Sequence, residues 1–177
     1  MKQLAISTAK GFIEVENQGE EEIFLSLMLS RTPSANENIE PAATGVEIDV
    51  QYTDLSGKAI SVEKLRQGEE FFANIRVRKV AEDSQSMALT YAVPSGWEIW
   101  NERLVGGKDA SQADYTDIRD TQISWYFALE QGKRQEFIVR MRAAYEGSFI
   151  LPPAICEDMY NPSCRANTSN RSVIVER

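Results

Sequence analysis

The sequence of 177 residues contains no histidine and only two cysteines. Without histidine, the chain cannot form a Ser-His-Asp or Cys-His catalytic centre or a histidine-ligated zinc site. It also has no apolar run near the roughly 18 residues that a membrane-spanning helix needs. Lysine and arginine residues are interleaved with acids, and the formal net charge is −8. A basic stripe that could neutralise nucleic-acid phosphates is therefore missing, and we expect no binding to nucleic acid.

Length and composition bound the number of domains. A domain usually has about 100–150 residues, so the chain has room for one well-packed domain and a piece of another. The hydrophobic fraction of 42% is typical of a globular protein, and we expect the acidity to serve solubility. Residues 1–7 are too few and too polar to form a secretory signal. We therefore expect any export signal to lie upstream of Met1.

Apolar and polar residues alternate along much of the chain, a pattern that predicts β-strands with one buried face. The alternating runs cover residues 23–30, 46–52, 71–78, 123–129, 137–143 and 173–175. Within the run 71–78, the odd-numbered residues are predicted to point inward and the even-numbered ones outward. The turn 130–133, which contains a glycine, predicts a β-hairpin between the runs on either side of it.

The fold class follows from the many short runs and the turns between them. No segment of a dozen residues has a helical period, so helix is limited to single turns, for which 62–65 and 101–104 are candidates. Many short strands with frequent turns are typical of two packed antiparallel sheets. We therefore predict an all-β fold, an antiparallel β-sandwich of the immunoglobulin-like kind.

The composition changes at residues 32–44, which are polar, contain two prolines and have no apolar period. We interpret this segment as a linker. The residues 1–31 before it are too few to bury a core of their own. Their strands are predicted to pair with the main sandwich over 45–177, with another copy of the chain, or with a part of the protein outside this sequence.

Two cysteines, Cys156 and Cys164, flank a loop of seven residues. In an oxidising compartment they could close a disulfide, whereas in the cytosol they would stay reduced as two thiols. A zinc site lacks ligands, and we expect no metal and no cofactor. Catalysis by Cys156 is disfavoured, because the carboxylates of Glu157 and Asp158 would raise its pKa by like-charge repulsion.

Paired acids are the remaining candidates for chemistry. Asp117 with Asp120, and Glu157 with Asp158, have the residue types that glycosidases use. At these spacings and in turns, such carboxylates are mostly solvated. We therefore predict no catalytic residue and no enzyme activity for this chain.

The segment that follows Pro152 and Pro153 is unusual. The two prolines end a strand and force an extended exit, so the next residues are predicted to form an ordered loop that presents Met159 and Tyr160. A flexible thioether beside an amphipathic ring suits packing against another surface. The residues alone leave two alternatives open, internal packing and an interface.

Several segments together resemble the C-terminal macroglobulin-like domain of bacterial alpha-2-macroglobulins. The matching segments are 92–99 (AVPSGWEI), 115–122 (YTDIRDTQ), 147–153 (GSFILPP), 159–162 (MYNP) and, upstream, 52–57 (YTDLSG) and 65–68 (LRQG). They extend the resemblance to about residues 45–177. Residues 1–31 are similar to the strands that return through a CUB-like β-sandwich domain in that family.

The resemblance implies a role in a very large protease-trapping inhibitor. It implies an extracytoplasmic location, in the periplasm or at the cell envelope, with lipid anchoring through an upstream segment as one arrangement. The partners would be the helical thioester domain of the same protein and, for the whole inhibitor, the target proteases. In the family this domain packs over an internal thioester, and a Met-Tyr pair that helps exclude water matches Met159 and Tyr160.

The sequence departs from the family pattern in two ways. It contains no thioester motif, since Cys156 is followed by Glu157 and Asp158, and it contains no bait region.

A second hypothesis from a different class is a stand-alone cell-surface β-sandwich module that binds carbohydrate or peptide. That hypothesis predicts an exposed aromatic platform, for which Trp97, Trp100 and Tyr115 are the candidates.

Overall fold

The computed structural model describes residues 14–22, 24, 37–81, 86–100 and 113–177. The chain divides into two compact units, Met1–Ala35 and Asn36–Arg177. In the first unit, the backbone N–H of Gly19 donates to Oδ1 of Asn17 over 3.0 Å. The predicted alternating run 23–30 lies, apart from Phe24, outside the described residues.

The second unit is built from β-strands, and helix is absent from the ranges that the structure describes. Its strands are β1 (Ala42–Thr44), β2 (Val46–Thr53), β3 (Lys64–Arg66), β4 (Glu70–Lys79), β5 (Ser86–Ala92), β6 (Trp97–Ile99), β7 (Tyr115–Arg119), β8 (Gln122–Ala128), β9 (Arg134–Ala143), β10 (Gly147–Leu151), β11 (Ile155–Asp158), β12 (Arg165–Asn167) and β13 (Arg171–Glu176). The predicted all-β class is confirmed. A helix that could span a membrane is likewise not found in these described ranges.

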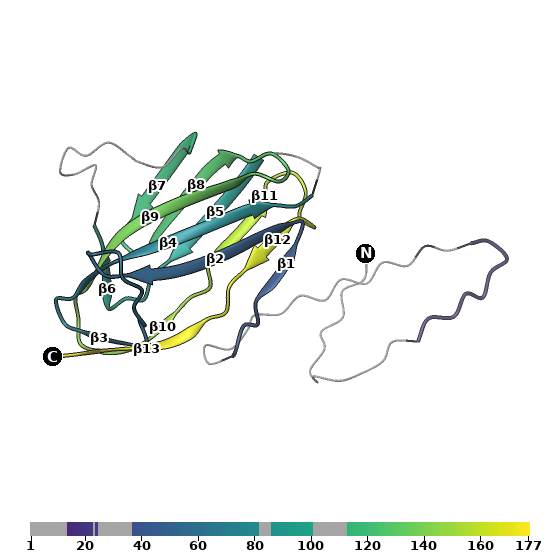
Figure 1. Ribbon diagram of the computed structural model, residues 1–177. Helices are drawn as coiled ribbons and strands as arrows, with labels where there is room; N and C mark the ends of the chain where they lie inside the picture. The colour runs from purple at the N-terminus through teal and green to yellow at the C-terminus, as the bar shows by residue number, and fades with distance from the viewer. Residues whose placement is uncertain (1–13, 23, 25–36, 82–85, 101–112) are drawn as a thin grey trace. The chain divides into compact units, whose positions relative to one another are not determined.

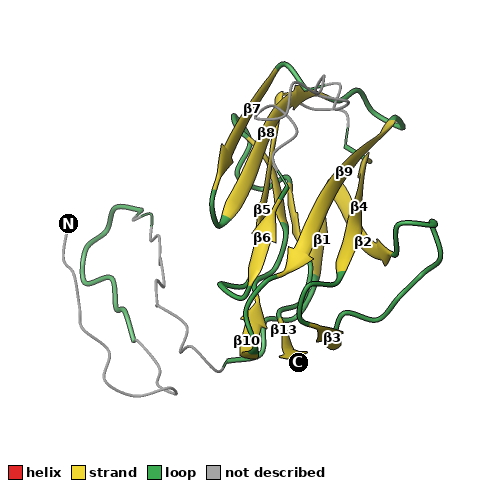
Figure 2. Cartoon of the chain, turned by 90° about the vertical axis from the view of Figure 1, so that its left-hand side faces the viewer, coloured by secondary structure: helices red, strands yellow, loops and turns green. Residues whose placement is uncertain are grey.

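The strands form three sheets. The six-stranded sheet has the order β1-β12-β11-β5-β8-β7, the four-stranded sheet β2-β4-β9-β6, and the three-stranded sheet β10-β13-β3. All neighbours are antiparallel except β13 and β3, which are parallel. Figures 1 and 2 show the two larger sheets stacked as layers, with β10, β13 and β3 at the end where the chain terminates. This arrangement is the predicted sandwich.

The core lies between the layers and is filled by the rows that period-2 alternation marked as inward. In β4, the odd-numbered residues from Phe71 to Val77 are all buried, whereas Arg76 is exposed. The rings of Trp125 in β8 and Phe137 in β9 have centroids 4.9 Å apart, so the two layers meet through aromatic contact. Burial of apolar rows from both layers is the main stabilising contribution to such a fold.

The predicted hairpin around residues 130–133 is wrong. Strand β8 pairs with β5 and β7, and β9 pairs with β4 and β6, so the turn connects one sheet to the other. The turn itself is held by the end of β4, where Gly132 N donates to Lys79 O (2.9 Å) and Lys79 N donates to Lys133 O (3.2 Å). Alternation correctly predicted which face of each strand is buried. It does not distinguish two strands that pair within one sheet from two strands whose inward rows face each other across the core.

The segment before β2 also differs from its prediction as a linker. Residues Ala42–Thr44 form β1, which pairs antiparallel with β12. Asn170 holds the preceding residues, because its Oδ1 accepts from Ile39 N (2.8 Å) and its Nδ2 donates to Glu37 O (2.9 Å). The candidate helical turn at 62–65 is wrong as well, since β3 begins at Lys64. The other candidate turn, 101–104, lies outside the described residues.

Candidate functional site

The structure places Met159 and Tyr160 at the end of β11, where the chain leaves the six-stranded sheet. Strand β11 lies between β5 and β12, and its inward residues are Cys156 and Asp158. The next residues form the β11–β12 loop, which we define as residues 159–164. Within it, Met159 is 46% exposed and Tyr160 is 78% exposed. The loop therefore presents a thioether and an aromatic ring to its surroundings.

Hydrogen bonds give this loop a defined conformation. Oδ1 of Asp158 accepts from the backbone N–H groups of Tyr160 (2.9 Å) and Asn161 (3.1 Å). The N–H of Met159 donates to Ser86 O in β5, and the N–H of Cys164 donates to Asn161 O, both over 2.9 Å. An acceptor that takes two successive N–H groups is the typical stabiliser of an Asx turn. Most of the backbone donors in the loop are thus satisfied within the domain.

A buried ion pair lies directly beneath the loop. Nζ of Lys79 donates to Oδ2 of Asp158 over 2.9 Å, and both side chains are 0% exposed. The same Nζ lies 3.6 Å from Sδ of Met87 and 3.6 Å from Sγ of Cys164. Lys79 is in β4 and Asp158 in β11, so the pair joins the four-stranded sheet to the six-stranded one.

The sequence analysis missed this pair, although a signal for it exists. Lys79 continues the odd-numbered inward row of β4, and Asp158 continues the even-numbered inward row of β11. A charged residue at an inward position is rare unless a partner neutralises it. A charge at an inward position therefore marks each residue as one that needs a partner, and the fold brings the two together.

The two cysteines are buried thiols, not joined by a disulfide in the structure, on the same side of β11 and β12. Cys156 is opposite Ala166, and Asp158 N donates to Cys164 O over 2.9 Å, so the cysteines are diagonal neighbours. Diagonal neighbours lie about 7–8 Å apart, whereas a disulfide usually needs Cα atoms within about 4.4–6.8 Å. The predicted disulfide would require the ends of these strands to move closer, and it stays a prediction.

The thiol of Cys156 is poorly suited to act as a nucleophile. Burial, with Cys164 as the second contributor, raises its pKa from 9.0 to about 12. The predicted direction is correct, but the main cause is desolvation, with Glu157 and Asp158 contributing least. A thiol that stays protonated at neutral pH neither attacks substrates nor binds metal ions readily.

The acid pairs singled out in the sequence do not converge. Glu157 is exposed on the outer side of β11, while Asp158 is buried on the inner side. Asp117 forms an ion pair with Arg119 over 2.8 Å at the surface, and Asp120 is exposed in the turn after β7. Residue types that could jointly hold a metal ion are also not clustered anywhere in the described part of the chain.

The three aromatic residues proposed for a binding platform lie in different environments. Trp97 is buried and packs edge-on against Phe71, with ring centroids 4.9 Å apart. Trp100 follows β6 of the four-stranded sheet and lies beneath the guanidinium of Arg140, 4.8 Å from it. Tyr115 is exposed in β7 of the six-stranded sheet. The rings therefore do not form the common platform that carbohydrate binding would need.

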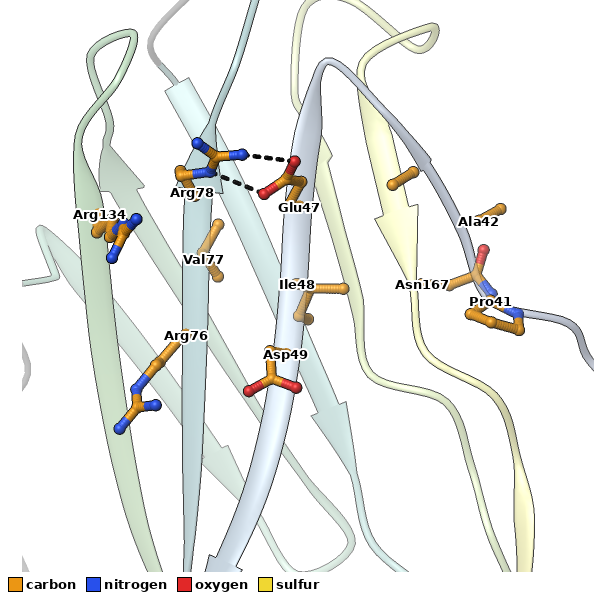
Figure 3. A pocket seen from close by; sticks show the side chains of 11 residues that line it. Pro41, Ala42, Glu47, Ile48, Asp49, Arg76, Val77, Arg78, Arg134 and Asn167 are labelled. Carbon is orange, nitrogen blue, oxygen red and sulfur yellow. Dashed lines mark hydrogen bonds and ion pairs between the residues drawn. The ribbon is translucent and has the colours of Figure 1, made fainter.

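A shallow pocket of about 620 Å³ lies over β2 and β4 (Figure 3). Arg78 lines it from β4, and its Nε and Nη2 donate to the two oxygens of Glu47 in β2 over 2.7 Å each. These hydrogen bonds lower the pKa of Glu47 and raise that of Arg78. Nearby, Arg76 pairs with Glu136 over 2.9 Å. The guanidinium groups of Arg76 and Arg78 are thus already neutralised by carboxylates of the protein itself.

The fold and the site define a β-sandwich domain that presents an ordered, exposed loop and lacks a convergent catalytic centre in its described residues. Residues 45–163 match the family described as "Bacterial Alpha-2-macroglobulin MG10 domain". The chain belongs to this family. The resemblance read from the sequence is thereby confirmed.

Relatives of known name agree with this assignment. The chain is 25% identical over 135 residues to alpha-2-macroglobulin of Pasteurella multocida (strain Pm70), covering 75% of this chain and 7% of that protein. It is 22% identical over 183 residues to alpha-2-macroglobulin of Escherichia coli (strain K12), covering 93% and 11%. The chain thus spans about a tenth of the length of these relatives.

Solved structures show the same fold. Trypsin-activated alpha-2-macroglobulin from Escherichia coli superposes with a TM-score of 0.71 at 20% identity, covering 78% of this chain and 11% of that one. A crystal structure of a tyrosine-to-glycine mutant of Salmonella alpha-2-macroglobulin gives a TM-score of 0.70 at 22% identity, covering 80% and 10%. The sandwich is therefore one domain of a much longer chain in these proteins.

Proposed function

We propose that this chain is a non-catalytic domain of a large macroglobulin-like protease inhibitor, and that it protects a thioester by packing over it. The observation that carries the proposal is the family match over residues 45–163 combined with the ordered, exposed pair Met159 and Tyr160. The domain would act through its surface and through conformational coupling. Residues 45–177 form this domain together with β1 and the residues just before it, and residues 1–31 belong to the end of a preceding β-sandwich domain.

The geometry of the loop supports a docking role. Met159 and Tyr160 expose apolar area whose removal from water contributes about 25 cal/mol per Å². Because the loop already has a defined conformation, little conformational entropy is lost when it docks. An ordered loop that carries exposed apolar groups is thus well suited to seal a reactive bond from water.

The relatives support the setting. Structures of Escherichia coli alpha-2-macroglobulin were solved after activation by trypsin and by porcine elastase, and a Salmonella alpha-2-macroglobulin was solved after reaction with methylamine. We infer that the protein containing this chain meets proteases as its targets. We place it outside the cytoplasm, in the periplasm or at the cell envelope.

The test uses the full-length protein with Met159→Ala/Tyr160→Ala. Loss of the two side chains opens the thioester to small nucleophiles, so we expect methylamine to react faster than in the wild type, without any protease cut. Release of the thioester thiol measures the rate. The matched control is Ile138→Ala/Tyr145→Ala, which removes two exposed apolar side chains elsewhere on the domain and leaves the rate unchanged.

Two outcomes would overturn the proposal. One is a methylamine rate in Met159→Ala/Tyr160→Ala equal to that of the wild type and the control. The other is a full-length sequence without a Cys-x-x-Gln thioester segment, since the pair would then have nothing to shield.

A further inference from the structure

We propose that Lys79 is a positioning residue for the β11–β12 loop. From the four-stranded sheet it fixes the carboxylate of Asp158 in the six-stranded sheet, and that carboxylate holds the backbone that presents Met159 and Tyr160. That this positioning serves to shield a thioester rests on the proposed function. The structural part of the proposal is testable in this chain by itself. It states that a buried lysine sets the conformation of a surface loop on the opposite sheet.

One carboxylate connects the core to the loop. Oδ2 of Asp158 accepts from Nζ of Lys79 over 2.9 Å, and Oδ1 accepts from the N–H groups of Tyr160 and Asn161 over 2.9 and 3.1 Å. One oxygen thus binds the buried ammonium group of Lys79, and the other binds the backbone of the loop. Rotation of the carboxylate would break both sets of bonds, so the ammonium group fixes the direction in which the other oxygen faces the loop.

Lys79 is itself held in place at the end of β4. Its backbone N–H donates to Lys133 O over 3.2 Å, and its carbonyl accepts from Gly132 N over 2.9 Å. The following residues, Val80 and Ala81, both donate to the carbonyl of Gly45 over 2.8 and 2.9 Å. The ammonium group therefore projects from a backbone that two neighbouring segments fix.

Energetics indicate that this pair serves position more than stability. A buried ion pair is often no more stabilising than apolar residues of similar volume, because desolvation of both charges offsets their attraction. The surrounding core is apolar and includes Met87 and Cys156, so an apolar pair would fit the setting. An apolar pair cannot accept the two N–H groups of Tyr160 and Asn161. That acceptance is what the charged pair adds.

The experiment measures amide hydrogen exchange by NMR in the 177-residue chain. In Lys79→Met the carboxylate of Asp158 loses its buried counter-charge and turns toward water. We expect the amides of Tyr160 and Asn161 to exchange about tenfold faster or more, through local opening. In Lys79→Met/Asp158→Asn a neutral acceptor can stay buried, so part of the protection returns.

An internal control is available in a second Asx turn. Oδ1 of Asp54 accepts from the N–H groups of Ser56 and Lys58 over 2.9 Å each, at the surface and far from Lys79 in the fold. A general loss of stability would accelerate exchange in both turns, whereas loss of positioning affects only Tyr160 and Asn161. The substitution Arg78→Met, which breaks the exposed pair with Glu47, should affect neither turn.

A second variant keeps the test decisive if Lys79→Met fails to fold. The substitution Lys79→Gln removes the buried charge but keeps a polar side chain and leaves Asp158 in place, so the sandwich is expected to fold while Tyr160 and Asn161 lose protection. Wild-type exchange at these two amides in Lys79→Met or in Lys79→Gln would overturn the inference.

Failure of the inference and failure of the proposed function are distinguishable in the full-length protein. If Lys79→Met frees the loop amides but Met159→Ala/Tyr160→Ala leaves the methylamine rate unchanged, the positioning role stands and the shielding function fails. If Met159→Ala/Tyr160→Ala raises the methylamine rate while the Lys79 variants leave the loop amides protected, shielding stands and the positioning role is wrong.

Discussion

The hydroxyl groups of Tyr52 and Tyr91 lie 3.0 Å apart inside the sandwich. Tyr52 is in β2 of the four-stranded sheet and Tyr91 in β5 of the six-stranded sheet, so one hydrogen bond joins the two layers. Both side chains are buried, and the ring of Tyr52 also packs edge-on against Trp97. Each hydroxyl satisfies the other where water has little access.

This relationship predicts non-additive effects of substitution. Tyr91→Phe leaves the hydroxyl of Tyr52 buried without its partner, so we expect a loss of about 1–3 kcal/mol in the free energy of unfolding. The double substitution Tyr52→Phe/Tyr91→Phe removes both groups and should cost less than the sum of the single ones. Urea unfolding of the three variants measures this coupling, and strictly additive values would contradict it.

The same pair predicts sensitivity to alkaline pH. Burial raises the pKa of Tyr52, and burial together with the charge of Tyr52 raises that of Tyr91 well above 10.0. A raised pKa in the folded state contributes stability that is fully present below the unfolded pKa and is lost as pH rises toward the folded pKa. Stability should therefore decline as pH rises above about 10. Urea unfolding at increasing pH checks this, and Tyr52→Phe/Tyr91→Phe should flatten the decline.

The buried thiols give a third prediction. Since the pKa of Cys156 is raised to about 12 and both cysteines are buried, a thiol reagent at neutral pH should react slowly with the folded chain. After unfolding without reductant, material made in a reducing compartment should show two thiols per chain. Material from an oxidising compartment should show none if the disulfide predicted from the sequence forms. Rapid reaction of the folded protein would be inconsistent with burial of Cys156 and Cys164.

The sequence allowed the buried faces to be predicted better than the pairing of strands. A period of two decides which side of a strand is apolar, and the inward row from Phe71 to Val77 is buried accordingly. It does not decide which strand lies alongside. The runs 123–129 and 137–143 were expected to pair, but Phe127 and Phe137 meet across the core with centroids 4.9 Å apart. A short turn can join strands within one sheet or between two.

The sequence also predicted one part of the candidate site and not the other. The loop that presents Met159 and Tyr160 was predicted from the residues, and the structure places it after β11 with both side chains exposed; their shielding role came only from the resemblance. The ion pair between Lys79 and Asp158 could not be derived without knowing that the end of β4 faces β11 across the core. The alternation identifies each of them as a charged residue at an inward position. Only the tertiary fold shows that the two lie close enough to pair.

The last prediction separates a docking loop from a core element by stability alone. Met159 and Met87 are the same residue type in opposite environments, the first 46% exposed and the second 0% exposed. In the 177-residue chain, Met159→Ala/Tyr160→Ala should change the free energy of unfolding by no more than about 0.5 kcal/mol, because truncating exposed side chains leaves no cavity. The N–H of Tyr160 still donates to Asp158 in this variant, so the loop keeps its conformation.

The matched substitution Met87→Ala should cost about 2–5 kcal/mol, because it removes a buried side chain and leaves a cavity between the sheets. Urea unfolding monitored by the fluorescence of the buried Trp97 and Trp125 compares the two variants directly. If the loop variant lost as much stability as Met87→Ala, Met159 and Tyr160 would contribute to the domain's own core, and their exposure would not be available for docking. A small loss leaves their apolar area free to be buried by a partner, which is the condition that shielding requires.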